Sequence, residues 1–109
     1  MTTITITKKS DDTFKMIECN GHAGFAEYGE DIVCAAVSVL TINLVNSIDS
    51  LTDDKILVDQ DEEQGLIRIR FENDPSQDAD LLLRSFELGI DSIFREYGKK
   101  FLNIKFRRE

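Results

Sequence analysis

The chain has 109 residues and a formal net charge of -8. A chain of this length can bury a core of its own, so we expect residues 1–109 to form a single domain. The acidic balance argues against direct binding of nucleic acid, because neutralising phosphates requires clustered Lys and Arg. Two cysteines are too few for a secreted disulfide scaffold and predict reduced thiols in the cytoplasm.

The first elements are two short strands. Residues 2–7 alternate Thr and Ile, which is the period-2 pattern of a half-buried strand. A second strand is expected at residues 13–19, after a polar turn, and the two form a hairpin. The N-terminus lacks the basic start and apolar stretch of a signal peptide, so we expect no targeting segment.

A loop over residues 21–30 follows, with Gly21, Gly24 and Gly29 in it. Such a loop could fold over a substrate or could equally be a plain connection. The next residues carry apolar side chains at helical spacing, from a start at Asp31 to Ile48. Asp31 or Glu30 is expected to cap this helix.

The apolar positions of this first helix surround most of its circumference. The sheet must therefore cover one side, and the second helix or a partner subunit another. The segment is short for a membrane span and contains Asn43 and Asn46, so we expect a buried helix and no membrane partner.

The second half is also expected to contain two strands followed by a helix. Strands are expected at residues 55–60 and 66–72, joined by a turn. A helix follows from about residue 78 to 97, closed by Gly98, and a last strand spans residues 102–107. The order β-β-α-β-β-α-β predicts an α+β fold, with two helices packed on a mainly antiparallel sheet.

Chemistry centres on Cys34 and His22. A thiol near a helix start is favoured as thiolate, the nucleophilic form, and Cys34 is predicted to lie about three residues into its helix. His22 is the single histidine, and it precedes that helix start. Its imidazole could take the thiol proton and return it to a leaving amine. The alternatives are a buried structural cysteine and an unremarkable surface histidine.

Three other residues have candidate supporting roles. Asp31 could orient His22, although capping is the expected role. Ser38 is one helical turn beyond Cys34, and a hydrogen bond back to its own helix is expected before one to the thiol. Backbone N–H groups near Cys34 could hold an oxyanion. Cys19 lies in a strand and is expected in the core. One His and two Cys at these spacings form no zinc pattern, so neither metal nor cofactor is expected.

The sequence resembles the bacterial ribosomal-processing cysteine proteases, the Prp family. The likeness rests on Gly21-His22-Ala23 and on Tyr28-Gly29-x-Asp31-Ile-Val-Cys34-Ala-x-Val-Ser38, and extends over the whole chain. It implies removal of a short N-terminal extension from a large-subunit ribosomal protein, after an apolar, aromatic-rich segment, so that ribosomes can assemble.

The resemblance also implies residue roles and an assembly. Cys34 would be the nucleophile and His22 its base, with Gly21, Asp31 and Ser38 in support. The glycine loop, with Gly24, Tyr28 and Gly29, would close over the substrate peptide, and the protein would be a homodimer. Two alternatives stay open: a non-catalytic binding module in ribosome assembly, and a redox-sensing thiol with Cys19 as resolving partner.

Overall fold

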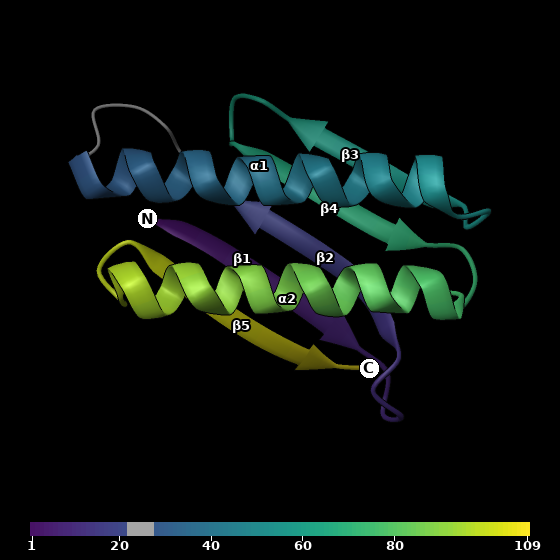
Figure 1. The fold of residues 1–109 in the computed structure, drawn as a ribbon. Coiled ribbons are helices and arrows are strands. Elements are labelled where there is room, and N and C mark those ends of the chain that lie inside the picture. Colours follow the sequence, from purple (N-terminus) through teal and green to yellow (C-terminus); the bar gives the residue numbers. More distant parts are fainter. Residues whose placement is uncertain (22–27) are drawn as a thin grey trace.

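The computed structural model describes residues 1–21 and 28–109, which form five strands and two helices (Figure 1). In chain order these are β1 (Thr2–Lys8), β2 (Phe14–Asn20), α1 (Tyr28–Leu51), β3 (Ile56–Asp61), β4 (Leu66–Phe71), α2 (Gln77–Tyr97) and β5 (Leu102–Arg108). This order confirms the expected β-β-α-β-β-α-β arrangement.

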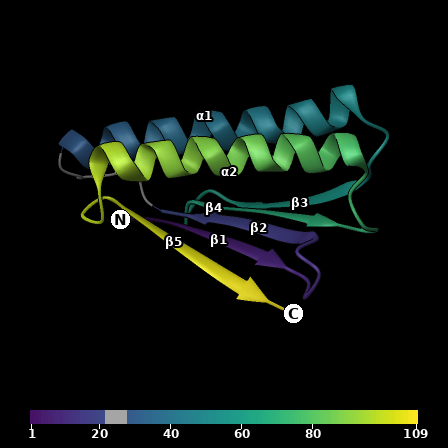
Figure 2. The ribbon, with the colours of Figure 1, turned by 60° about the horizontal axis from the view of Figure 1, so that its bottom comes forward.

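All five strands join one sheet in the order β3-β4-β2-β1-β5. The pairs β1–β2, β2–β4 and β3–β4 are antiparallel, and only β1–β5 is parallel, so the sheet is mixed but mainly antiparallel. Figure 2 shows both helices on the same face of this sheet. The two predicted hairpins are present, and β3 and β5 form opposite edges.

The core lies between the sheet and the helices. Strand alternation sends one set of side chains toward the helices, as the period-2 pattern predicted. The buried strand residues include Ile4, Ile6, Ile17, Cys19, Ile69 and Leu102, and Ile56 of β3 packs against them partly buried. They meet the buried residues of the two helices, which are Val33, Val37, Leu44, Ile48, Leu83, Phe86 and Ile90. One continuous core therefore serves all seven elements, as a single domain requires.

Helix α2 covers the side of α1 that the sheet leaves open. The helices run side by side in both views (Figures 1 and 2). They approach closely at Gly89, where a Cβ atom would lie 2.9 Å from the Leu40 Cδ1 atom. The second helix thus satisfies most of the requirement that the apolar α1 sequence imposed, although Val39 and Ile42 stay exposed on its outer side.

The start of α1 differs from the prediction. The helix begins at Tyr28, so Asp31 is its fourth residue and the prediction that Asp31 or Glu30 caps it is wrong. An acidic side chain is favourable throughout the first turn of a helix as well as at its N-cap, so the sequence alone does not separate a cap residue from a first-turn residue.

Residues 31–51 of α1 are long and apolar enough to cross a membrane, by length and composition alone. A core helix meets the same criterion. Here Val33, Val37, Leu44 and Ile48 are buried against the sheet and α2, which is the packing of a core helix.

Candidate active site

Cys34 opens into a cavity of about 290 Å³ between α1 and the β3–β4 hairpin. Helix α1 contributes Cys34 and Ser38, Gly21 lines the cavity just after the end of β2, and the remaining lining comes from the hairpin. The Cys34 side chain is only partly buried. The thiol is therefore accessible from a concave surface that could hold a chain.

Two glycines bring the end of β2 against the β3–β4 turn at the wall of this cavity. The Gly21 N–H donates to the Gly65 carbonyl oxygen at 3.1 Å. Gly65 has φ +64°, and a Cβ atom there would lie 1.9 Å from the Gly21 oxygen. A Cβ atom at Gly21 would lie 2.8 Å from the Thr2 Oγ1 atom. Both positions must therefore be glycine for the backbones to approach this closely. The contact between Gly21 and Gly65 fixes the position of Gly21 at the cavity wall.

Ser38 acts on the backbone of Cys34. Its hydroxyl donates to the Cys34 carbonyl oxygen at 2.8 Å, which confirms the expected bond to its own helix. The N–H of Cys34 lies six residues beyond the helix start, past the first four N–H groups that an α-helix leaves unbonded. The prediction that Cys34 lies about three residues into the helix is therefore wrong, and the backbone N–H of Cys34 is not a free donor for an oxyanion.

Cys19 is a core residue, as predicted. Burial raises the pKa of its thiol to about 11. The Thr41 hydroxyl donates to the Val37 carbonyl oxygen at 2.7 Å, so its oxygen is left to accept from the Cys19 thiol, 3.2 Å away. Cys19 and Cys34 line a common small cavity of about 40 Å³. That shared cavity supports the alternative of a redox-sensing thiol with Cys19 as resolving partner. A buried thiol with a raised pKa, however, rarely ionises to the thiolate that disulfide formation requires.

The other predicted site residues have mixed outcomes. His22 and Gly24 lie outside the described residues. Tyr28 and Gly29 belong to the first turn of α1, so their placement in the loop is wrong. Asp31 is exposed on α1, where a carboxylate near the helix N-terminus is favourable.

The β3–β4 hairpin supplies most of the cavity wall, and sequence reasoning missed it. Gln60, Asp61, Glu62, Gly65 and Leu66 all line the cavity. The turn glycine was visible in the sequence, but a hairpin turn explains a glycine without any site. Nothing in the sequence indicates that this turn faces Cys34.

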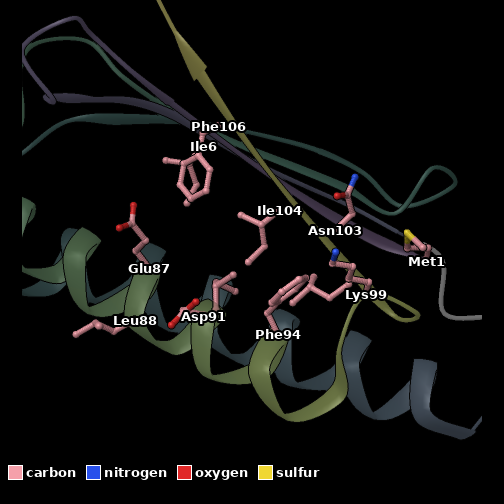
Figure 3. Close-up of a pocket in the computed structure, with 12 residues that line it drawn as sticks. Met1, Ile6, Glu87, Leu88, Asp91, Phe94, Lys99, Asn103, Ile104 and Phe106 are labelled. Atoms are coloured by element: carbon pink, nitrogen blue, oxygen red, sulfur yellow. The ribbon is translucent and has the colours of Figure 1, made fainter.

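A larger cavity, of about 820 Å³, lies between α2 and β5 at the opposite edge of the sheet (Figure 3). Ile90, Phe94 and Ile104 form part of its apolar lining, and Glu87 and Asp91 stand along its α2 side. It contains no cysteine or serine, so its size does not make it the reactive site. Across residues 1–21 and 28–109, no group of three or more His, Cys, Asp or Glu side chains is placed to hold a metal ion.

Comparisons with known proteins identify the class. The sequence model described as cysteine protease Prp matches residues 1–102. A Staphylococcus aureus protein named ribosomal processing cysteine protease Prp is 32% identical over 106 residues, covering 96% of this chain and 100% of that protein. The Bacillus subtilis protein of the same name is 34% identical over 97 residues, covering 85% of this chain and 87% of its own.

Solved structures agree in fold. The crystal structure of S. aureus Prp with a covalently linked product peptide has a TM-score of 0.87 at 29% identity, covering 98% of this chain and 100% of that one. The crystal structure of SMU.848 from Streptococcus mutans has a TM-score of 0.88 at 32% identity, covering 100% and 99%. The protein is therefore a cysteine protease with an α+β fold. Within that class, the chain belongs to the Prp family.

Proposed function

We propose that Cys34 is the nucleophile of this protease and that His22 is its general base and acid. One observation carries the assignment of the nucleophile. The chain has two cysteines; Cys19 is buried, whereas Cys34 is partly exposed in a cavity between α1 and the β3–β4 hairpin. His22 follows Gly21 in the chain, and Gly21 lines that same cavity.

In the proposed reaction, Cys34 is the nucleophile and His22 acts in turn as base and acid. His22 removes the proton from Cys34, and the thiolate adds to the scissile carbonyl carbon. The tetrahedral intermediate collapses as His22 gives its proton to the leaving amine, which leaves an acyl-enzyme on Cys34. Water then adds with His22 as base, and the carboxylate product and the free thiol are released. Ser38 supports Cys34 by bonding its carbonyl oxygen, and Gly21 sets the position at which the chain reaches His22.

The substrate is the N-terminal extension of a large-subunit ribosomal protein, removed to permit ribosome assembly. The relatives in S. aureus and B. subtilis are named ribosomal processing proteases, and a related S. aureus structure contains a substrate peptide. The enzyme acts in the cytoplasm, without a cofactor, a membrane or direct contact with nucleic acid. Its two free thiols suit a reducing compartment.

The test is cleavage of a peptide spanning the extension junction. The parent should cut it and Cys34→Ala should not, while urea unfolding shows that both are folded. Cys34→Ser should be severely impaired, because a serine hydroxyl is far less acidic than a thiol. His22→Ala should lose cleavage at an unchanged unfolding midpoint, because the thiol then lacks its base. Equal cleavage by the parent and Cys34→Ala would remove the thiol from the mechanism.

The enzyme is a homodimer, in which a second copy covers the α2–β5 cavity. Leu88 and Phe106 are 70% and 66% exposed there (Figure 3), and exposed apolar side chains gathered at a hollow are typical of protein contacts. This edge of the sheet is opposite the edge formed by β3, so both Cys34 cavities stay open.

Analytical ultracentrifugation tests this assembly. The parent should sediment as a dimer at micromolar concentration, and Leu88→Lys and Phe106→Lys should sediment as monomers. Leu81→Lys is the matched control, because Leu81 is an exposed leucine of α2 that is absent from the cavity lining. A monomeric parent, or dimeric Leu88 and Phe106 variants, would refute the proposed contact.

A further inference from the structure

A second hollow lies beside the Cys34 cavity along α1. This hollow has a volume of about 190 Å³ and shares Gln60 and Ile67 with the Cys34 cavity. Its remaining lining comes from the same helix and hairpin, namely Thr41, Ile42, Val45, Asn46 and Val58. The two hollows form one trough between α1 and the β3–β4 hairpin, with the thiol toward one end.

The second hollow has apolar walls that are open to solvent. Val58 pairs with the fully buried Ile69, so it points to the helix side of the sheet. It is nevertheless 41% exposed, because β3 is the edge strand and α1 does not cover it. Ile42 faces the same hollow from α1 and is 51% exposed. Burying such side chains under a ligand is favourable in proportion to the apolar area removed from water.

Three polar residues, Thr41, Asn46 and Gln60, also line the hollow. Asn46 and Gln60 are exposed residues at its rim, whereas Thr41 is buried. The Thr41 hydroxyl donates to the Val37 carbonyl oxygen and lies within hydrogen-bond reach of the Cys19 thiol, so it has little left for a ligand. A polar side chain packed against the apolar wall of Ile42, Val45 and Val58 would lose water without gaining a hydrogen bond there, which is costly. A volume of about 190 Å³ corresponds to about six water molecules at roughly 30 Å³ each, which is room for one branched or aromatic side chain.

Helix geometry sets the distance from this hollow to the reaction. Ile42 and Val45 follow Cys34 by eight and eleven residues on α1, or about 12 and 17 Å at a rise of about 1.5 Å per residue. An extended peptide advances about 3.3 Å per residue. A chain lying in the trough with its scissile carbonyl at Cys34 therefore places a side chain about four to five residues away into the hollow.

We propose that this hollow is a specificity subsite of the protease. It selects peptides that carry a bulky apolar side chain about four to five residues from the scissile bond, and Ile42 and Val58 are the residues that impose the selection. The assignment rests on the proposed function, because it takes Cys34 as the point of cleavage. The occupant is the substrate itself, since the hollow adjoins the cavity of the thiol and shares Gln60 and Ile67 with it.

A peptide series tests the subsite. Starting from a peptide that the parent cleaves, each position within six residues of the cut is replaced in turn by Ser, and kcat/KM is measured. The parent should lose roughly 10- to 100-fold at one position four or five residues from the cut. A loss confined to the residues flanking the scissile bond, or no loss at all, would overturn the proposal.

Two substitutions on one strand supply the matched control. Val58→Asp should lower kcat/KM for the apolar peptide by roughly 10- to 100-fold and should recover activity on a peptide with Lys at the selected position. Leu57→Asp should leave both values unchanged. Leu57 is similarly exposed, at 44%, but it pairs with Arg70 and so faces the other side of the sheet. Equal effects of the two substitutions would overturn the role of Val58.

Two further measurements keep the result interpretable. Val58→Thr, which is nearly isosteric, should reduce the apolar preference in the same direction if Val58→Asp folds poorly, and circular dichroism checks the fold of each variant. A parent that cleaves the peptide without preference refutes only the subsite. A parent no more active than Cys34→Ala refutes the proposed function itself.

Discussion

Replacing Gly65 by Ala tests whether the β3–β4 turn positions the active site. The new Cβ atom would lie 1.9 Å from the Gly21 oxygen, and φ is +64°, so neither the contact nor the backbone can be kept. A left-handed conformation costs a residue with a Cβ atom about 1–2 kcal/mol. Losing the Gly21–Gly65 hydrogen bond costs about 0.5–1.5 kcal/mol more. We expect a loss of about 2–3 kcal/mol in the free energy of unfolding.

The same substitution should also reduce activity in the folded enzyme. The backbone at Gly21 must move by an ångström or more to relieve the contact, and His22 is the next residue in the chain. A misplacement of that size at a catalytic group can cost about 100-fold in rate. Urea unfolding followed by circular dichroism gives the stability, with an expected midpoint shift on the order of 1–2 M. Peptide cleavage without urea gives kcat/KM.

Gly98→Ala is the control. Gly98 has φ +77° and nothing within 4 Å of its Cβ position, and it caps the end of α2 by donating to the Phe94 carbonyl oxygen at 2.7 Å. This variant should lose stability through backbone strain and keep the parental kcat/KM. If Gly65→Ala also keeps the parental kcat/KM, the turn does not position the catalytic residues and the reasoning is refuted.

Two further predictions concern stability. The pKa of Cys19 is raised from 9.0 to about 11, so the unfolded chain loses the thiol proton first as pH rises. The free energy of unfolding should therefore fall between pH 9 and 11, by about 2–3 kcal/mol more in the parent than in Cys19→Ala; equal pH profiles in urea unfolding would contradict this. Ser76 accepts from the Ala79 N–H at 3.1 Å as the N-cap of α2, so Ser76→Ala should cost about 1–2 kcal/mol in thermal or urea unfolding. Ser92→Ala, which removes only a bond to the Leu88 carbonyl oxygen, should be near neutral, and an equal loss in both variants would argue against capping.

Much of the fold could be predicted because local patterns carry it. The alternating Thr and Ile residues of β1 predicted which side chains face the core, and Ile4 and Ile6 are fully buried. The apolar spacing of α1 and α2 predicted both helices, since the side chains that a helix buries recur every three to four residues. The start of α1 was placed three residues late, because several polar residue types are compatible with both a cap and a first turn.

The site was less predictable from local signals. The sequence singled out Cys34 by residue type and by its place near the start of an apolar helix, and Ser38 by its spacing of four residues from Cys34. It did not indicate that the β3–β4 hairpin forms the cavity wall. Gln60 and Ile67 line the same cavity as Cys34 because the order of strands in the sheet places the hairpin beside α1. Val58 shows the same limit: it lies on the helix side of the sheet, but its position on the edge strand β3 leaves it 41% exposed.

The sequence by itself determined the elements and their order, and through a family resemblance it predicted the reactive pair of Cys34 and His22. These depend on periodicity, glycine positions and residue chemistry, all of which act over a few residues. Tertiary structure decided which cysteine is accessible, why Gly21 and Gly65 must be glycines, and where a trough leads away from the thiol. Each of those depends on the pairing of strands distant in the chain, and such pairing is set by the packing of the whole core rather than by any local stretch.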